Sequence, residues 1–385
     1  MRIEFELTSG LAAGALETLW RDLEPRAPAN FFRSWHWIGA WLAQLKCLPV
    51  AVSPVVLIGR QQGTVVVLGV LVASRRLPVG PAAIAGVRLH TTGNAALDVI
   101  TIEYNGFLVD AALGCEGENA ALDFLLDNAG IDPLVCDEID LRNVSRLYLD
   151  YAAKRSLVYR LVGRKPSYRI DLDAVRASGK PYLDHLSANT RQQIRRSMRL
   201  YEKSGPLALR RAADLPEAIT FLAGLKALHQ PYWQSRGEPG AFAYPFLEAL
   251  MLGLIADGLA NGTVELVRIS RGDLAIGYLY NFVYRGQVYC YQCGFLFEVD
   301  AKLKPGLVSH ALCIEDHLRA GLSIYDFMGG DARYKSSLGE PGPDLHYVIL
   351  QRPTLPIRIE NGLRGVRDRL RAVRRVPEIT IKIPD

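Results

Sequence analysis

The chain has 385 residues, of which 49% are hydrophobic and 22% are charged. This length exceeds what a single hydrophobic core usually organises, so two domains are expected. No apolar run approaches the ~20 residues that a membrane span requires, and the opening MRIEFELTSG has no signal-peptide pattern, so we expect a cytoplasmic protein. The six cysteines are scattered, which indicates reduced thiols rather than a disulfide framework.

The first block, residues 1–165, begins with helical segments and continues with strands. Residues 11–45 favour helices that bury Trp37, Ile38 and Trp41. The apolar runs PVVLIG and TVVVLGVLVAS, separated by RQQG, predict a β-hairpin. A helix, AALDFLLDNAG, and a strand, VCDEIDLRNV, follow. The block therefore predicts one complete α+β layer.

The second block, residues 166–355, follows the linker GRKPSYRIDLDA. It opens with a basic helix over 187–203 and continues with a strand and two helices. A hairpin with the turn RGD, the strand QVYCYQCGFLF, a helix, the short strand SIYDFM and a last strand LHYVILQR complete it. This order predicts a mostly antiparallel mixed sheet with helices on both faces.

The basic character of the chain is concentrated in its tail, residues 356–385. The formal net charge is +5, and residues 358–375 alone hold seven arginines against two acidic residues. Leu363, Val366 and Leu370 recur at helical spacing among the arginines, which predicts an amphipathic helix. Contact with an anionic membrane surface, contact with an acidic acceptor or RNA, and docking onto the protein body all stay open. A solvated basic helix with one packed stripe has the same pattern.

Residues 286–335 have the outline of a phosphate cradle. A strand leads through the loop EVDAKLKPG into a helix, and the start of a helix presents unpaired N–H groups and a positive dipole end to a pyrophosphate. Lys302 and Lys304 add positive charge, and Gly306 lets a ligand approach the backbone closely. An ordinary connection from strand to helix has the same outline, so both interpretations stay open.

Two groups of cysteine and histidine residues raise the question of a metal. Because successive side chains of a strand alternate between faces, Cys290 and Cys293 are expected to point in opposite directions. His310, Cys313 and His317 share one face of a helix and could reach a zinc ion, but no fourth ligand is evident and packing is favoured. We expect no metal. A nucleophilic serine route also lacks support, since no G-x-S-x-G motif is present.

Several motifs of the second block resemble the GNAT superfamily of acyl-CoA-dependent N-acyltransferases, in its CelD-like branch associated with cellulose biosynthesis. They are LSANTRQQIRRSMRLYEKSG, FLAGLKALHQPYWQSRG, VELVRISRGDLAIGYLYNFVYRGQVYCYQCGF and KPGLVSHALCIEDHLRAG. The closing IYDFMGGDARYK, with the shape D-F-x-G-G-x-x-x-Y-K, is the most specific. FFRSWHWIGAW, HTTGN and CDEIDLRNV resemble the N-terminal half of such proteins.

The resemblance covers roughly residues 1–350 and implies an α+β protein with two GNAT-like domains in tandem, each a mostly antiparallel mixed sheet flanked by helices. The first domain, 1–165, would be degenerate and the second, 166–355, would hold the coenzyme A groove. It also implies structural kinship with Fem-type transferases, which take an aminoacyl group from tRNA. The usual pyrophosphate signature Q/R-x-x-G-x-G/A is absent, and KLKPG occupies its place.

What the resemblance implies for binding can be stated residue by residue. Acyl-CoA would be the co-substrate, held at a splayed central strand and at the helix start by Gln292, Cys293, Gly294, Phe295, Lys302, Lys304, Gly306 and Leu307. The acceptor, a small amine or amino sugar, would be lined by the facing helix and the central strand through Trp233, Arg236 and Tyr291.

Direct acyl transfer needs a polarised thioester carbonyl, a neutral amine and a protonated leaving thiolate. The candidate bases are His229, Asp326 and Asp331, with Glu265 less favoured. A histidine titrates in the useful range unaided, whereas a carboxylate needs burial or a chain of waters. His229 could instead cap its helix, and Asp326 could hold the closing turn.

Two further residues of the closing motif have candidate roles. Tyr334 could protonate the thiolate, and Lys335 could bind a phosphate or carboxylate of either substrate. Tyr334 could equally be a core residue.

The function expected from these observations is transfer of an acyl group from acyl-CoA to an amine by direct attack on the thioester. Fem-type aminoacyl transfer from charged tRNA is an alternative, favoured by the basic helix and the arginine-rich tail. A non-catalytic component of a polysaccharide or envelope assembly is the other alternative.

Overall fold

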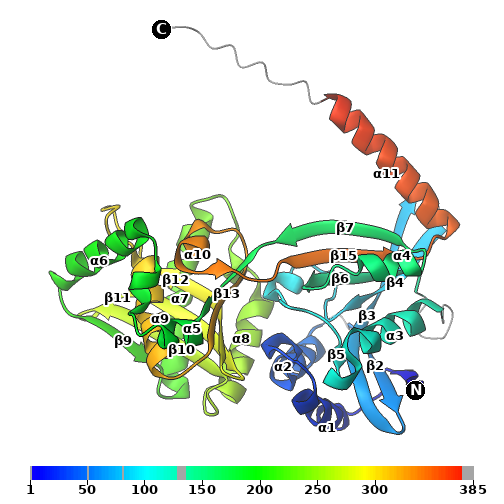
Figure 1. Ribbon diagram of the computed structural model, residues 1–385, viewed down its shortest axis with the longest axis horizontal. Coiled ribbons are helices and arrows are strands. Elements are labelled where there is room, and N and C mark those ends of the chain that lie inside the picture. The colour runs from blue at the N-terminus through cyan, green and yellow to red at the C-terminus, as the bar shows by residue number, and fades with distance from the viewer. Residues whose placement is uncertain (1, 50–51, 80–81, 128–135, 375–385) are drawn as a thin grey trace.

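Two mixed β-sheets with helices on their faces organise the chain (Figure 1). The computed structural model describes residues 2–49, 52–79, 82–127 and 136–374. Its two sheets, one built mainly from the first half of the chain and one from the second, confirm the predicted α+β class with tandem domains.

The first sheet has the order β1-β2-β3-β4-β6-β15-β7 within the described residues, with β5 beside β3. All its neighbours are antiparallel except β4 and β6. The predicted hairpin is confirmed, and its turn places Gln62 and Gly63 at positive φ, as a tight hairpin turn requires. The strands are β1 Glu4–Thr8, β2 Pro54–Gln61, β3 Thr64–Val79, β4 Ala82–Leu89, β5 Leu108–Val109, β6 Glu138–Val144, β7 Val158–Lys165 and β15 Leu345–Gln351.

The helices of the first domain are α1 Ala13–Leu23, α2 Trp35–Lys46, α3 Gly114–Asp127 and α4 Leu149–Lys154. The helices expected over 11–45 are confirmed, and Trp37, Ile38 and Trp41 are buried as predicted. α3 packs with Leu122 in a separate apolar cluster on the first sheet. The end of the predicted helix AALDFLLDNAG lies outside the described residues.

The second sheet has the order β14-β8-β13-β12-β11-β10-β9 within the described residues. β9 to β12 form the predicted antiparallel meander, and a helical crossover makes β13 parallel to β12. The strands are β8 Ser167–Asp171, β9 Leu207–Arg211, β10 Val264–Arg271, β11 Leu274–Tyr284, β12 Gln287–Phe295, β13 Ile324–Gly329 and β14 Glu340–Pro341. The helices are α5 Leu172–Ala177, α6 Ala188–Glu202, α7 Leu215–Gln234, α8 Pro245–Gly258, α9 Pro305–Arg319 and α10 Arg333–Leu338.

The two faces of the second sheet have different partners. α7 and α8 cover the face that carries Tyr280 and Phe282, which also meets the first domain. α5, α6 and α9 cover the opposite face, where Val267 and Ile269 are fully buried. The prediction of helices on both faces is confirmed.

The last strand corrects one sequence prediction. LHYVILQR was expected to close the second block, but β15 lies in the first sheet between β6 and β7. The strand comes from a distant part of the chain, fills the gap between β6 and β7, and buries Val348 and Leu350 completely. The expected range 166–355 therefore includes a strand of the first sheet, because the sequence order of strands does not reveal a non-local pairing.

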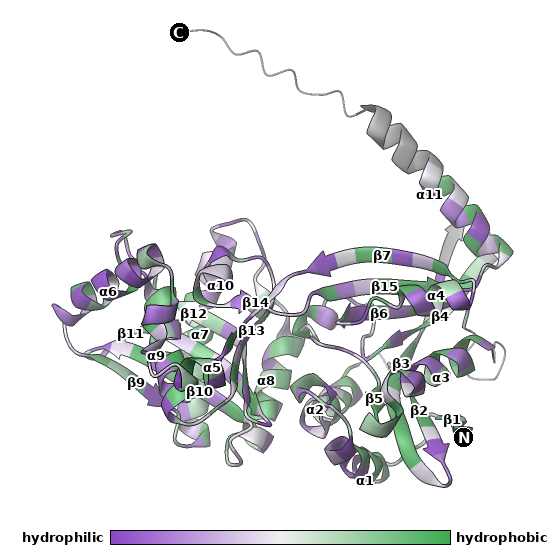
Figure 2. Cartoon of the chain, viewed as in Figure 1, coloured by the Kyte–Doolittle hydropathy of each residue, from purple (hydrophilic) through white to green (hydrophobic). Residues whose placement is uncertain are grey.

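The tail forms the predicted helix, α11 (Leu355–Arg374), which runs away from both sheets (Figure 1). Its first turns dock onto the first sheet: Ile357 is fully buried, and Arg76 donates to Glu360 at 2.8 Å. Leu355, Ile359 and Leu363 are exposed, and Figure 2 shows hydrophobic and hydrophilic residues mixed along the described part of this helix. Among the described residues, no helix combines the length and apolarity of a membrane span.

Candidate functional site

β12 and β13 pair over only three residues and then separate. Gln287 to Tyr289 lie beside Ile324 to Asp326, and no further register between the two strands follows in the described chain. The strand β12 also contains a bulge, because Tyr280 faces Gln292 whereas the next residue, Asn281, faces Cys290. The extra residue, Tyr291, donates its hydroxyl to the backbone oxygen of Ile100 in the first domain. Parallel strands that part in this way leave backbone groups of β12 free for a ligand.

A cavity of about 920 Å³ occupies the opening between the two strands. Its walls are the outer half of β12, the last turns of α7, the start of α9 and the turn after β13, with residues of the first domain opposite. The predicted site residues that it brings together are His229, Trp233, Tyr291, Gln292, Cys293, Gly294, Phe295, Lys304, Gly306, Leu307, Asp331, Tyr334 and Lys335.

Three predicted residues lie outside this cavity. Lys302 is exposed in the loop before α9. Arg236 is exposed and stacks its guanidinium over the Tyr232 ring at 3.8 Å, so only Tyr232 reaches the cavity wall. Asp326 faces a separate cavity of about 310 Å³.

One end of the large cavity is formed by the beginning of α9. The first N–H groups of a helix have no acceptor within it, and here they lie at Gly306 and Leu307 in the cavity wall. A Cβ on Gly306 would lie 3.3 Å from the Phe295 ring, so glycine keeps this approach open. The backbone N–H of Lys304 donates to Ser197 at 2.8 Å, which fixes the basic helix α6 beside the same end. The arrangement fits the predicted phosphate cradle.

The other end brings a carboxylate from the first domain against the closing motif. Glu103 is 4% exposed and accepts a hydrogen bond from the backbone N–H of Gly329 at 2.6 Å. Lys335 donates to the backbone oxygen of Gly329 at 2.7 Å. Burial raises the pKa of Glu103 and lowers the pKa of Lys335. Sequence reasoning missed Glu103, because an acidic residue in the loop TIEYNG carries no signal of a contact across the domains.

The predicted base His229 lies in the wall formed by α7. It is 6% exposed, and burial lowers its pKa, which favours the neutral imidazole. Its ring nitrogen Nδ1 is 3.2 Å from the side-chain oxygen of Gln230. A neutral imidazole at the cavity can accept a proton, so the structure is compatible with the predicted role.

Tyr334 and Asp331 both belong to the closing turn but differ in burial. The Tyr334 ring stacks on the buried His310 ring at 5.1 Å, and burial raises the pKa of Tyr334 well above its usual value. Asp331 is exposed at the cavity rim. Tyr334 therefore keeps its proton, which a donor to a thiolate requires.

Asp326 is buried between the domains. Its carboxylate accepts from the Tyr104 hydroxyl at 3.0 Å and from the backbone N–H of Met328 at 2.6 Å. Burial raises its pKa to about 7 even though these bonds oppose the shift. Met328 has a φ of 59°, so Asp326 holds a strained turn, as the structural alternative expected.

The bulge in β12 corrects the expectation for the two neighbouring cysteines. Cys290 and Cys293 both contact the apolar cluster on the α9 side of the sheet, because the extra residue Tyr291 interrupts the alternation of faces. Burial raises the pKa of Cys290 to about 11 and raises that of Cys293 as well. Both side chains are therefore protonated thiols in an apolar environment.

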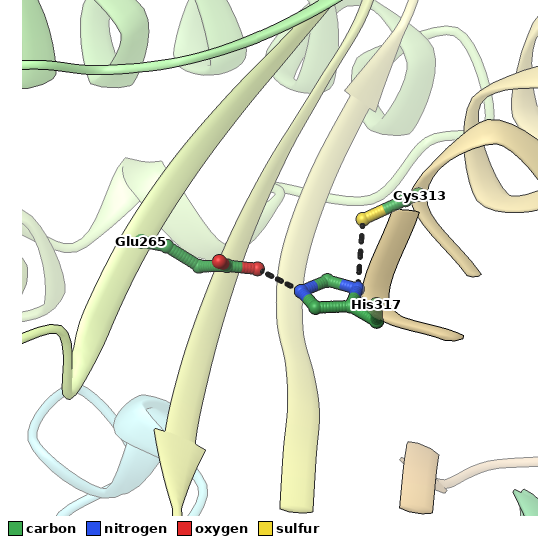
Figure 3. Close-up of side chains that lie close together, drawn as sticks. All are labelled: Glu265, Cys313 and His317. Atoms are coloured by element: carbon green, nitrogen blue, oxygen red, sulfur yellow. Dashed lines mark hydrogen bonds and ion pairs between the residues drawn. The ribbon is translucent and has the colours of Figure 1, made fainter. Parts of the chain in front are cut away.

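The cluster predicted from His310, Cys313 and His317 has a different membership in the structure. His310 turns toward the Tyr325 hydroxyl at 3.2 Å, and Glu265 from β10 takes its place (Figure 3). His317 lies between Glu265, at 2.6 Å from its Nε2, and the Cys313 sulfur, at 3.5 Å from its Nδ1.

Glu265 serves packing of α9 against the sheet. Arg211 and Asn281 also donate to its carboxylate, at 2.9 and 2.8 Å. Cys313 is fully buried and its pKa is raised well above its usual value by burial. The group lies away from the large cavity, and Glu265, proposed as a weaker base, does not line that cavity.

Comparisons with known proteins agree with this geometry. Residues 188–336 match the family of the acetyltransferase (GNAT) domain. This stretch of the second block therefore has the pattern of a GNAT domain, and the resemblance inferred from the sequence is confirmed. Comparison with curated protein sequences gives no match.

Solved structures share the fold of the whole chain at low identity. The crystal structure of FemX has a TM-score of 0.55 at 12% identity and covers 89% of this chain and 97% of its own. L-PGS from Bacillus licheniformis has a TM-score of 0.50 at 7% identity, covering 91% and 96%. A conserved protein of unknown function from Bacteroides thetaiotaomicron has a TM-score of 0.51 at 9% identity, covering 91% and 100%. At these identities the likeness shows the fold alone.

Proposed function

We propose that the protein is an N-acyltransferase that moves an acyl group from acyl-CoA to an amine by direct attack on the thioester. The observation that carries this proposal is the open edge of β12 beyond Tyr289, which ends at the start of α9 and faces the buried carboxylate of Glu103. One cavity thus offers free backbone groups, a helix start and a proton acceptor.

The donor would lie along the open edge. The diphosphate of coenzyme A would meet the N–H groups at Gly306 and Leu307, with Lys304 beside them. The pantetheine would follow β12, and a backbone N–H between Gln292 and Phe295 would polarise the thioester carbonyl. Lys302, which lies outside the cavity, would contact only the solvent-facing part of the donor.

The acceptor amine would approach from the side of the first domain. Glu103 would take a proton from the amine, directly or through water, as the new C–N bond forms. The C–S bond then breaks, the Tyr334 hydroxyl donates a hydrogen bond to the leaving thiolate, and the thiolate takes up the proton that Glu103 received from the amine. Lys335, which is fixed to the closing turn, would stabilise negative charge that is present near Glu103. His229 is the alternative proton acceptor on the opposite wall.

Two measurements test the proposal. Coenzyme A is expected to raise the melting temperature of the protein, because a ligand that binds only the native state stabilises it. Free thiol should be released from acetyl-CoA or longer acyl-CoAs when candidate amines, including amino sugars, are added. Stabilisation without release from any donor would favour a non-catalytic assembly component. If coenzyme A gave no stabilisation and no donor released thiol, the assignment of coenzyme A to this cavity would be wrong.

The fold of FemX and the surface of α6 support one second candidate, aminoacyl transfer from tRNA. Arg195, Arg196 and Arg199 are exposed on α6, which is fixed beside the start of α9 by the Ser197 contact. Arg195 is partly neutralised by Asp184 at 3.0 Å. Tight tRNA binding that weakens steeply with salt, together with no effect of coenzyme A, would favour this candidate over the first.

A further inference from the structure

A second cavity of about 330 Å³ adjoins the large one inside the first domain. It lies where β6 and β7 end and β15 begins. Thr101 and Lys165 line both cavities, so the two spaces meet at these residues. An acceptor that passes these two residues would reach both cavities. Its volume far exceeds the roughly 10–15 Å³ that a cavity needs to hold one water molecule.

The backbone around this cavity departs from regular sheet geometry. β6 carries an extra residue opposite β15, since His346 faces Val144 and Val348 faces Leu141. Asn143 in this bulge has a φ of 53°, and Thr101 has a φ of 41°. A left-handed conformation is unfavourable for a β-branched threonine. Bulges of this kind re-aim side chains, and here the bulge places Arg142 in the cavity wall.

The walls carry three cationic side chains and one acidic one. Arg142, Arg164 and Lys165 line the cavity together with Asp98. Asp98 is already engaged, because its oxygens accept from the backbone N–H groups of Thr92 and Gly93, both at 2.7 Å. Its carboxylate also lies 3.7 Å from the Arg142 guanidinium, so its negative charge is partly balanced by that cation.

The cations differ in how far they are neutralised. Arg164 forms an ion pair with Asp344 at 2.6 Å, and Arg142 lies 3.4 Å from Asp140. Lys165 is exposed and makes no ion pair within 4.0 Å with a carboxylate of the described chain. An anion at this junction would be attracted by Lys165 without displacing an existing partner.

Thr91 supplies an independent sign of a missing ligand. It belongs to the HTTGN loop, is only 5% exposed and lines the cavity. Its hydroxyl is buried without a hydrogen-bond partner among the described residues. Buried polar groups are nearly always paired, so an unpaired hydroxyl in a cavity wall indicates a position for an oxygen-bearing ligand.

We propose that this cavity binds an anionic group, a phosphate or a carboxylate, at the far end of the acceptor whose amine enters the large cavity. The inference rests on the proposed acyl transfer. Lys165 and Arg142 would meet the charge, and the Thr91 hydroxyl would donate to one anionic oxygen. The acceptor is then an amine that carries a negative charge several bonds from its nitrogen, rather than a neutral amine.

The experiment measures binding of inorganic phosphate by the full chain at constant ionic strength, from the shift in melting temperature. Saturating coenzyme A is present, so that the predicted diphosphate site at α9 is filled. Thr91→Val removes only the unpaired hydroxyl, and Lys165→Met removes the unpaired charge. The concentration of phosphate for half the full shift is expected to rise at least threefold in each variant.

Lys154→Met is the matched control, because Lys154 is exposed on α4 of the same domain and does not line the cavity. It should respond to phosphate as the wild type does. Thr91→Val should also leave the response to coenzyme A unchanged. Malonate in place of phosphate distinguishes the two anions, and a stronger response to malonate would assign a carboxylate.

Equal phosphate responses in the wild type, Thr91→Val and Lys165→Met would overturn the inference. The inference would also be overturned if phosphate shifted the melting temperature only in the absence of coenzyme A, because the phosphate would then occupy the donor site. If coenzyme A has no effect on the wild type, the proposed function fails. The comparison of the wild type with Thr91→Val still tests the anion site in that case.

Discussion

Glu103 enters the large cavity from the first domain, and Gly329 opposite it has no room for a larger residue. A Cβ on Gly329 would lie 3.1 Å from a carboxylate oxygen of Glu103. This close contact brings the carboxylate to the turn that carries Lys335. A buried carboxylate with a raised pKa is a better proton acceptor than an exposed one, because its basicity is closer to that of the amine.

Glu103→Gln is expected to lower kcat about 10²- to 10³-fold, because the variant keeps an oxygen for the Gly329 N–H and loses the proton acceptor. The KM for acyl-CoA should change less than about twofold, since the donor end at α9 is untouched. Steady-state kinetics with the responsive amine check this. His229→Gln is the matched comparison, and a large loss confined to His229→Gln would assign the base to the other wall.

Asp326 gives a prediction on stability and pH. Burial raises its pKa in the folded state to about 7 from the value of 3.8 expected when exposed. The folded state therefore binds its proton more tightly than the unfolded chain does. The contribution of Asp326 to stability is fully present below about pH 4 and is lost as pH rises through 7.

Asp326→Asn should remove this pH dependence. The free energy of unfolding of the wild type, minus that of Asp326→Asn, is expected to fall by about 2–4 kcal/mol between pH 4 and pH 8. Urea unfolding at a series of pH values measures the difference. A constant difference across the series would mean that Asp326 is not buried as a protonated acid.

At the scale of elements, the contact of α7 with β12 sets one wall of the large cavity. A Cβ on Gly294 would lie 2.4 Å from the backbone oxygen of Leu225 in α7. Backbone atoms cannot yield as a flexible side chain can, so the helix would have to move. Gly294 thus has a packing role in addition to its predicted place beside the donor.

Gly294→Ala is expected to destabilise the protein by about 1–3 kcal/mol and to weaken the binding of coenzyme A, because α7 shifts away from β12. Gly253→Ala in α8 is the control, since nothing lies within 4 Å of its added Cβ. That variant should be more stable by about 0.5–1 kcal/mol. Chemical denaturation of both variants tests the prediction, and equal effects would argue against the clash.

The helix α11 carries a stripe of exposed apolar side chains. Leu355, Ile359 and Leu363 recur at intervals of four residues and are 70%, 46% and 52% exposed. Basic helices with an apolar stripe bind anionic membranes, so the full chain is expected to sediment with vesicles that contain anionic lipid and not with neutral vesicles. Leu363→Glu should reduce the bound fraction severalfold. If this variant bound the vesicles as well as the wild type does, the apolar stripe of α11 would not take part in the membrane contact.

At the scale of the whole molecule, sequence patterns predicted the two layers, the meander and a helix start at Gly306, one residue from the observed start of α9, because periodicity and turn residues are local signals. The bulge at Tyr291 was not predictable, since one extra residue leaves no mark in composition. The placement of β15 beside β7 and the contact of Glu103 with Gly329 join segments that are 180 or more residues apart in the sequence. Such pairings come from three-dimensional packing, which a single sequence does not display.

Those long-range contacts also join the two domains into one core. Phe31 of the first domain stacks on Phe282 of β11 with ring centroids 4.0 Å apart. The Tyr284 hydroxyl donates to Glu24 at 2.6 Å, and Arg285 donates to the backbone oxygen of Ala27 at 2.8 Å. Because β7 precedes and β15 follows the strands of the second sheet, the first domain holds both ends of the second domain's chain in place.

We therefore expect the domains to unfold together. Phe31→Ala should destabilise the protein by about 3–5 kcal/mol, because it leaves a cavity among buried rings. Hydrogen exchange should speed up by similar factors at α2 in the first domain and at β11 in the second. Faster exchange at α2 alone would show that the domains open independently. Glu103 would then lose its fixed position opposite Gly329, and catalysis would depend on transient domain closure rather than on a site built into one shared core.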